Sequence, residues 1–257
     1  MWTDFLTPVR WLLRGVLLAL MALLGTPVTV LTINRYGRAV RVAGKTLDEF
    51  MLNWWTASVC RIFGIRVDAQ GSPLAPPCLV VANHISWLDI IVLHSQAAMG
   101  FVSKAEIARW PLIGFLARLS GTLFHQRGDH ASSSNVAEIM TARLGEGGRV
   151  AVFPEGGIIE GDFIKRFHGR LFRAAIEGGF PVQPVMIRYL RKGRRDPDAG
   201  FRKGENFMVN FLRLLGRPQS TCELRFLAPL ESAGSQRNEL ARKSQAAITA
   251  AFEAPLA

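Results

Sequence analysis

A histidine and an aspartate that could share a proton stand five residues apart in the stretch NHISWLD, residues 83–89. The apolar run CLVVA ends just before this stretch, which would therefore form a strand-to-helix turn. If both side chains face one cavity, His84 is a candidate general base, and Asp89 would fix its tautomer and stabilise the imidazolium. The spacing alone is weak evidence, because Ser86 as a helix N-cap would explain much of the same stretch without any catalysis.

A second candidate residue, Arg127, lies in the stretch GTLFHQRGD, residues 121–129, just after an expected strand. A guanidinium in such a polar turn can hold a phosphate through two parallel hydrogen bonds. The alternative is a solvated surface arginine that pairs with Asp129. Without further context the surface arginine is the better interpretation.

Two further turns complete the set of candidates. Glu155 lies in VFPEGG, residues 152–157, where Gly156 and the next glycine would let a ligand approach the backbone. An exposed glutamate in a tight loop explains this stretch equally well. The fourth stretch, VQPV at residues 182–185, reads as a strand with an internal proline, which predicts a sheet edge or the rim of a cleft.

The elements that would position these turns alternate between strands and helices. This alternation predicts an α/β fold with a mostly parallel central sheet flanked by helices, in which sites lie at strand ends. The expected strands are 78–82, 100–103, 122–125, 149–153, 182–187 and 223–227. The expected helices are 86–96, 110–119, 131–145, 168–178 and 236–252.

The N-terminal segment has the composition of a membrane anchor. Residues 15–34 carry no charge, and a helix of that length would reach about 30 Å, the thickness of one hydrocarbon core. A full span is favoured, with a re-entrant or interfacial hairpin second, because Pro27 interrupts the stretch, and a buried core helix third. A retained anchor is preferred to a cleaved signal peptide, since no A-x-A site closes the apolar run.

The next segment, residues 45–63, has the apolar spacing of an amphipathic helix. Its tryptophans at 54 and 55 suit either a lipid headgroup boundary or packing on the globular core. We therefore expect an N-terminal membrane anchor and amphipathic helix over residues 1–64, followed by the α/β domain over residues 65–257.

Composition narrows the classes of partner. Of 257 residues, 49% are hydrophobic, and the formal net charge is +11, so an anionic surface such as lipid or nucleic acid is expected. Nucleic acid is disfavoured because the basic residues lack an interleaved aromatic binding motif. The three widely spaced cysteines predict small buried side chains rather than disulfides or a zinc site.

Taken in order, the four turns resemble the four motifs of the glycerolipid acyltransferases, of which NHISWLD matches the Asn-His-x4-Asp motif. The segment FVSKAEIARWPLIGFLARLSG, residues 101–121, also resembles the family's connecting segment and makes Lys104 a candidate substrate-binding residue. The resemblance covers about residues 60–230. It is strongest to bacterial 1-acyl-sn-glycerol-3-phosphate acyltransferases, also called lysophosphatidic acid acyltransferases.

The third motif departs from the family pattern. The family usually continues Phe-Pro-Glu-Gly with Thr-Arg-Ser, whereas here Gly157, Ile158 and Ile159 follow, so an arginine expected to bind phosphate is missing. The segment KRFHGR, residues 165–170, including Arg166, is a candidate source of replacement cations. Variants of this kind occur in bacterial branches that acylate other lysolipids, such as lyso-ornithine lipid.

The resemblance implies the chemistry of each residue. His84 would deprotonate the acceptor hydroxyl with Asp89 on its far nitrogen, and the alkoxide would attack an acyl thioester. Arg127 would hold the head group, Glu155 would position its polar part, and backbone amides near Gly156 would stabilise the oxyanion. No G-x-S-x-G motif suggests an acyl-enzyme, and no metal or cofactor is expected.

The implied partners are a lysolipid acceptor, acyl-CoA or acyl-carrier protein as donor, and an anionic membrane surface, with no nucleic acid. The expected activity is conversion of lysophosphatidic acid to phosphatidic acid in phospholipid biosynthesis, with lyso-ornithine lipid as the alternative acceptor. A non-catalytic membrane-binding protein is the remote alternative. Positive charge after the N-terminal segment places the catalytic domain on the cytoplasmic side of the bacterial inner membrane.

Overall fold

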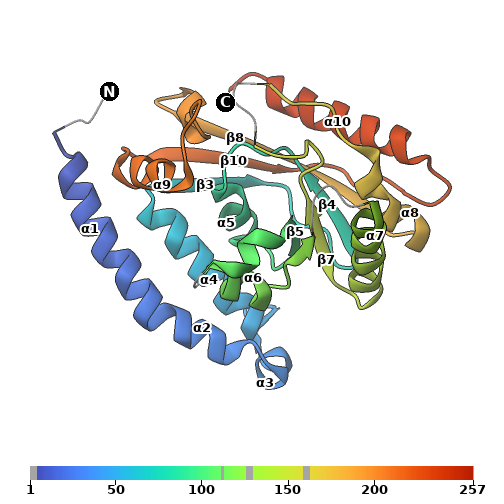
Figure 1. The fold of residues 1–257 in the computed structure, drawn as a ribbon, viewed down its shortest axis with the longest axis horizontal. Coiled ribbons are helices and arrows are strands. Elements are labelled where there is room, and N and C mark those ends of the chain that lie inside the picture. The colour runs from blue at the N-terminus through green and yellow to red at the C-terminus, as the bar shows by residue number, and fades with distance from the viewer. Residues whose placement is uncertain (1–4, 111–112, 126–129, 159–162, 257) are drawn as a thin grey trace.

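The computed structural model describes the chain except residues 1–4, 111–112, 126–129, 159–162 and 257. The described residues form an eight-stranded central sheet in the order β3-β10-β8-β4-β7-β5-β6, with β9 paired to β8 (Figure 1). Its strands are β3 (Ile65–Gln70), β4 (Cys78–Ala82), β5 (Gly100–Lys104), β6 (Leu123–His125), β7 (Arg149–Val152), β8 (Val182–Arg191), β9 (Arg194–Arg195) and β10 (Ser220–Phe226).

The sheet is mostly parallel, as expected. Among the described strands of this sheet, only β10 with β8 and β8 with β9 pair antiparallel. All six expected strands are present within a few residues of their expected bounds, whereas β3 and β9 were not expected. A separate two-stranded ribbon joins β1 (Arg41–Val42) to β2 (Lys45–Thr46).

The expectation that residues 182–185 form a sheet edge is wrong. The strand β8 lies in the interior of the sheet, between β4 and β10. Pro184 is tolerated because its carbonyl accepts from the Leu227 amide at 3.0 Å, one residue beyond the end of β10. In a strand the N–H and C=O of one residue point to the same side, so the missing donor falls where the ladder has already ended.

Helices cover both faces of the sheet and enclose two cores. One face carries α4 (Leu47–Ile62), α5 (Leu88–His94) and α9 (Phe207–Gly216). The other carries α7 (His130–Gly145), α8 (Arg173–Gly178) and α10 (Arg237–Glu253). Alternate residues of β4 enter the two cores, with Val80 in the first and Leu79 and Val81 in the second. Because both faces are covered, this strand is wholly apolar.

Several further helical elements of the domain are short. They are α3 (Arg35–Ala39), α6 (Ile113–Leu119) and 3₁₀ turns over Ala105–Arg109, Gly169–Phe172 and Pro197–Ala199. The helix expected at 168–178 begins as one of these turns, and α5 is shorter than expected. The helix α9 was not expected, although its sequence FMVNFLRLLG is strongly apolar.

The N-terminal helix runs along the outside of the domain (Figure 1). It consists of α1 (Thr7–Leu20), a π-helical turn (Met21–Gly25) and α2 (Thr26–Thr32). The wider π turn directly precedes Pro27 in the first turn of α2, where a regular helix would clash with the proline ring. The apolar helix therefore begins eight residues earlier than the charge-free segment and continues through the proline.

Polar contacts hold this helix against the domain at both ends. The Arg14 guanidinium donates to the carbonyls of Leu215 and Arg217, both at 2.7 Å, where α9 ends. The Trp11 indole donates to the Leu212 carbonyl at 2.7 Å. At the other end, the Trp55 indole of α4 donates to the Thr26 hydroxyl at 3.1 Å. The helix Thr7–Thr32 is long and apolar enough to cross a membrane, yet it lies along the domain.

Most of the segment 45–63 forms α4, and the first core includes Val59 and Cys60 of this helix and Phe63 just after it. The expected division at residue 64 separates this helix from the domain it packs on, and that division stays a prediction. All three cysteines are free and buried, which confirms the expectation that they are small core side chains.

Candidate active site

The turn after β4 is fixed to the neighbouring strand by an asparagine. The Asn83 side chain donates to the Ile187 carbonyl and accepts from the Ile187 amide, both at 2.8 Å. Asn83 is 1% exposed, so this pair continues the β4–β8 ladder beyond the last strand residue in a dry environment. The asparagine therefore sets the direction in which the chain leaves the sheet.

His84 and Asp89 face each other across this turn. The His84 Nδ1 lies 2.9 Å from the Asp89 Oδ2, and Asp89 is fully buried in the first turn of α5. The same oxygen accepts from the amides of Ile85 at 2.7 Å and Ser86 at 2.9 Å. The carboxylate thus organises the turn and also orients the imidazole, whereas the Ser86 hydroxyl accepts only a long 3.4 Å contact from Leu88.

The opposite edge of the imidazole faces the pocket. The His84 ring stacks on Phe153, with centroids 3.9 Å apart and planes 12° from parallel, and its side chain is 12% exposed. Its hydrogen bond to Asp89 uses Nδ1, which leaves Nε2 on the edge away from the carboxylate. With Nδ1 held by the carboxylate, Nε2 is the atom available to take a proton from a bound hydroxyl.

Glu155 is held by two backbone amides rather than left open to solvent. It follows β7, is 6% exposed, and accepts from the His84 amide at 2.7 Å and from the Lys165 amide at 3.1 Å. Burial raises the pKa of this carboxyl to about 7, against the two hydrogen bonds that lower it. Glu155 therefore ties the histidine backbone to the segment that starts at Phe163.

The two glycines after Glu155 adopt positive φ angles. Gly156 has φ 81° and Gly157 has φ 157°, and a Cβ on Gly156 would come within 3.6 Å of the His168 ring. This turn needs glycine because other residues are strained in that conformation. The Gly156 amide makes a 3.4 Å contact with the Phe153 carbonyl, and its role toward an oxyanion stays a prediction.

The other predicted site residues are less closely connected to this centre. Lys104 is the last residue of β5 and pairs in register with His125, whereas Arg166 is exposed in the segment after the third motif. Arg127 lies outside the described residues. The structure thus brings together His84, Asp89, Glu155 and Gly156. Within the described part of the chain, no group of three or more His, Cys, Asp or Glu residues could hold a metal ion.

Sequence reasoning missed Tyr189, which reaches the same centre from β8. Its hydroxyl donates to the Asp89 Oδ1 at 2.8 Å across 100 residues of sequence. In the sequence, Tyr189 stood out only as the one polar aromatic residue in the buried part of β8. Residue spacing cannot predict that such a residue contacts Asp89, which is far away in the sequence. The roles of Asn83 and Phe153 also depend on strand pairing and were not assigned from sequence.

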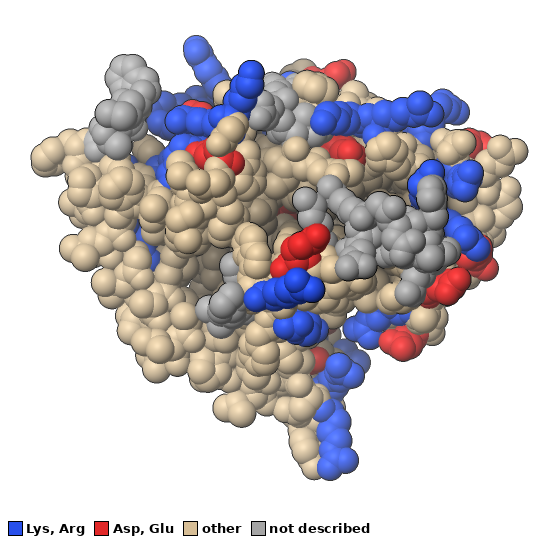
Figure 2. All heavy atoms as spheres, in the orientation of Figure 1, with Lys and Arg blue, Asp and Glu red and all other residues tan. Residues whose placement is uncertain are grey.

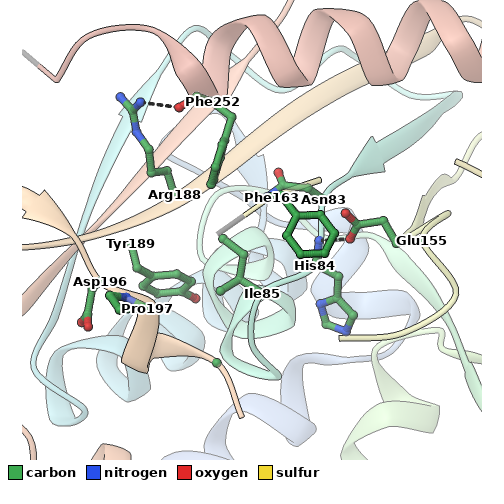
Figure 3. A pocket seen from close by; sticks show the side chains of 11 residues that line it. Asn83, His84, Ile85, Glu155, Phe163, Arg188, Tyr189, Asp196, Pro197 and Phe252 are labelled. Atoms are coloured by element: carbon green, nitrogen blue, oxygen red, sulfur yellow. Dashed lines mark hydrogen bonds between the residues drawn. The ribbon is translucent and has the colours of Figure 1, made fainter. Parts of the chain in front are cut away.

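One pocket, shown in Figure 3, is lined by Asn83, His84, Glu155 and Tyr189 among other residues. His84 and Glu155 lie at one end with the Phe163 ring beside them, and Tyr189 and Asp196 lie at the other. Phe252 of α10 forms part of the upper wall. The pocket therefore combines a histidine base, buried carboxylates and apolar walls, a combination that suits a substrate with a hydroxyl on an apolar chain.

Both the sequence and the fold of this chain match known proteins. The model of the Acyltransferase family matches residues 65–188, which include all four motifs. A lyso-ornithine lipid O-acyltransferase of Pseudomonas aeruginosa is 38% identical over 206 residues, 80% of each chain. A 1-acyl-sn-glycerol-3-phosphate acyltransferase of Neisseria gonorrhoeae is 32% identical over 126 residues, 49% of each chain. The crystal structure of a 1-acyl-sn-glycerophosphate acyltransferase from Thermotoga maritima has the same fold, with a TM-score of 0.70, 21% identity and 96% coverage of both chains.

Proposed function

Because this chain belongs to the lysolipid acyltransferase family, we propose that it transfers a fatty acyl group from a thioester to the hydroxyl of lyso-ornithine lipid. The observation that carries acyl transfer is the His84 ring, oriented by Asp89 at 2.9 Å with its other edge toward the pocket. A base in that position can act on any hydroxyl placed within hydrogen-bond reach.

The reaction follows from this geometry. The acceptor hydroxyl gives its proton to His84 Nε2 while its oxygen attacks the thioester carbonyl, and Asp89 stabilises the imidazolium that forms. The tetrahedral intermediate collapses as the new C–O bond stays and the C–S bond breaks. The leaving thiolate then takes the proton back from the imidazolium. The donor is acyl-CoA or acyl-carrier protein, and the carboxyl group of Glu155 holds the histidine backbone in place throughout.

Two observations favour lyso-ornithine lipid as the acceptor, namely the residues of the third motif and the similarity to a known enzyme. At the position of the family's arginine stands Ile158, which is half-buried and apolar, so this turn offers no cation to a phosphate. An ornithine head group carries an ammonium and a carboxylate instead of a phosphate. The Pseudomonas relative, whose name includes lyso-ornithine lipid, matches 80% of the chain, which favours this acceptor.

Lysophosphatidic acid is the second candidate acceptor. It is supported by the similarity to the Neisseria enzyme and by the exposed cations Lys165 and Arg166 near the site, which could meet a phosphate. That similarity spans about half of each chain, so it supports this acceptor less strongly.

The deciding experiment offers both lysolipids to the purified protein in detergent with each thioester donor, and uses His84→Ala as the inactive control. A higher kcat/KM for lyso-ornithine lipid is expected. Preference for lysophosphatidic acid would establish the second candidate, and turnover of neither lipid would contradict the proposal. Ile158→Arg should move the preference toward the phosphate-bearing acceptor, whereas the matched apolar control Ile158→Leu should not.

The membrane attachment is proposed as interfacial. Arg14 and Trp11 are bonded to α9, and Trp55 bonds Thr26 near the opposite end of the N-terminal helix. A helix tied to one domain along its length cannot cross a bilayer while that domain stays in water. The exposed apolar side chains of this helix belong to the uncharged surface, drawn tan, at the lower left of Figure 2. They would therefore lie in the cytoplasmic leaflet beside the catalytic domain.

A further inference from the structure

The two oxygens of Asp89 are engaged very differently. Oδ2 accepts three N–H groups, all from the turn at residues 84–86. Among the described residues, Oδ1 accepts one hydrogen bond, from the Tyr189 hydroxyl at 2.8 Å. Because all three local bonds go to Oδ2, the position of Oδ1 depends on the hydrogen bond from Tyr189. Tyr189 therefore supplies the long-range restraint on the carboxylate.

Tyr189 is itself held firmly in place. It is 3% exposed, and its strand β8 is paired on both sides, with Tyr189 directly opposite Cys222 of β10. Burial and the nearby Asp89 charge raise the pKa of the Tyr189 phenol well above its usual value. The phenol thus keeps its proton at neutral pH, and its hydroxyl donates to the carboxylate.

We propose that Tyr189 is the positioning residue that completes a Tyr189–Asp89–His84 chain and fixes the plane of the Asp89 carboxylate. The orientation of the His84 ring depends on that plane, because Nδ1 is bonded to the same carboxylate. Tyr189, on the strand that begins with the fourth motif, thereby acts on the chemistry of the first motif through its bond to Asp89. This inference rests on the proposed acyl transfer.

The kinetic test is Tyr189→Phe, which removes the hydroxyl and keeps the ring that fills the strand position. Loss of a hydrogen bond to a charged group predicts a fall in kcat of roughly 10-fold or more. The KM values should change little, because the hydroxyl contacts Asp89. Tyr36→Phe is the matched control, since Tyr36 is the other of the two tyrosines and is 67% exposed. An unchanged kcat in Tyr189→Phe would overturn the proposal.

A double-mutant cycle separates positioning from simple packing. If Tyr189 acts through Asp89, the Tyr189→Phe change should have little further effect in an Asp89→Asn background. A packing role predicts the same loss of kcat in both backgrounds. An equal loss in the two backgrounds would therefore count against the chain of residues.

A spectroscopic readout does not depend on activity or on the stability of Tyr189→Phe. In Tyr36→Phe protein labelled with 3-fluorotyrosine, one ¹⁹F resonance reports on Tyr189. Asp89→Asn should shift this resonance, whereas Asp68→Asn on β3 should leave it in place. An unmoved resonance in Asp89→Asn would refute the contact. Should the protein acylate neither lysolipid, the proposed function fails while this measurement still decides the inference.

Discussion

The turn at residues 83–89, which holds His84 and Asp89, differs from the N-terminal helix in where it places polar and apolar groups. The turn buries Asp89 completely and gives its two oxygens four hydrogen-bond donors. The helix Thr7–Thr32 instead leaves eleven large apolar side chains exposed: Val9, Trp11, Leu12, Leu13, Val16, Leu17, Leu20, Leu23, Leu24, Val28 and Leu31. The proposed chemistry depends on individual hydrogen-bonding atoms, whereas membrane attachment depends on the total apolar area that the helix exposes.

This contrast predicts different responses to substitution. Removing one buried hydrogen-bonding atom leaves its buried partner unsatisfied, which costs the desolvation penalty of that partner. Removing one exposed apolar side chain from a large surface takes away only its own share of burial in lipid. Activity should therefore be sensitive to single changes at the turn, and membrane association should respond to changes over the whole helix.

The largest expected effect is that of His84→Ala on turnover. Loss of the general base should lower kcat by ~10²–10⁴-fold, because alanine offers no group that could take the proton from the acceptor hydroxyl. Membrane association should be unchanged, since the histidine lies in the pocket. Steady-state assays together with vesicle flotation measure both quantities. More than about a tenth of wild-type turnover would contradict the assigned base.

Deletion of residues 1–40 should have the next largest effect. It removes the exposed apolar helix and uncovers Trp55 and the face of α4 against which the helix packs. The truncated protein should leave the membrane fraction or aggregate, because it exposes a new apolar patch. The full-length protein should resist both high-salt and carbonate washes. Release of the full-length protein by salt alone would show that electrostatic attraction is its sole attachment.

Glu155→Gln should change how stability depends on pH. Burial raises the pKa of this carboxyl from 4.5 to about 7, so between these values the folded protein binds more protons than the unfolded chain. The protonated carboxyl therefore adds about 3 kcal/mol to the free energy of unfolding at low pH. This contribution is fully present below pH 4.5 and is lost as pH rises through 7. Gln does not titrate, so the variant should lack this loss.

Thermal unfolding of both proteins at pH 5 and pH 8 measures this difference. The Tm advantage of the wild type over Glu155→Gln should be greater at pH 5 than at pH 8. Glu177→Gln is a suitable control, because Glu177 is an exposed partner of Arg173 on α8. An equal advantage at both pH values would show that Glu155 is not protonated near neutral pH in the folded protein.

The sequence predicted the elements that have a clear local residue pattern. It missed the features that depend on pairing between segments distant in the sequence. The His84–Asp89 spacing after the apolar run of β4 was weak evidence alone, and the order of the four motifs made this pair the predicted catalytic residues. Position in the sheet was not readable for residues 182–185, because Pro184 is tolerated only where β10 happens to end. Tyr189 was missed for the same reason, since its partner lies 100 residues away.

The N-terminal helix shows the complementary limit. Its apolar character was evident from composition, yet its route along α9 depends on the Arg14 and Trp11 contacts with carbonyls that no local pattern identifies. The expected role of Glu155 toward the acceptor was likewise based on its type. In the structure both of its oxygens accept backbone amides, and its role toward the acceptor stays a prediction.

The smallest expected effect is that of Leu24→Ser on the exposed face of the N-terminal helix. Leu24 is 65% exposed and makes one of eleven comparable apolar contributions, so the remaining ten should keep the protein bound at saturating vesicle concentrations. Turnover should stay within about twofold of wild type, because no hydrogen bond of the dyad is altered. Flotation on vesicles and the acyltransfer assay, each compared with Asp89→Asn, measure the contrast directly. Asp89→Asn should abolish most turnover without releasing the protein. If Leu24→Ser alone released the protein, attachment would depend on one local contact, and the distinction between distributed attachment and atom-specific chemistry would be lost.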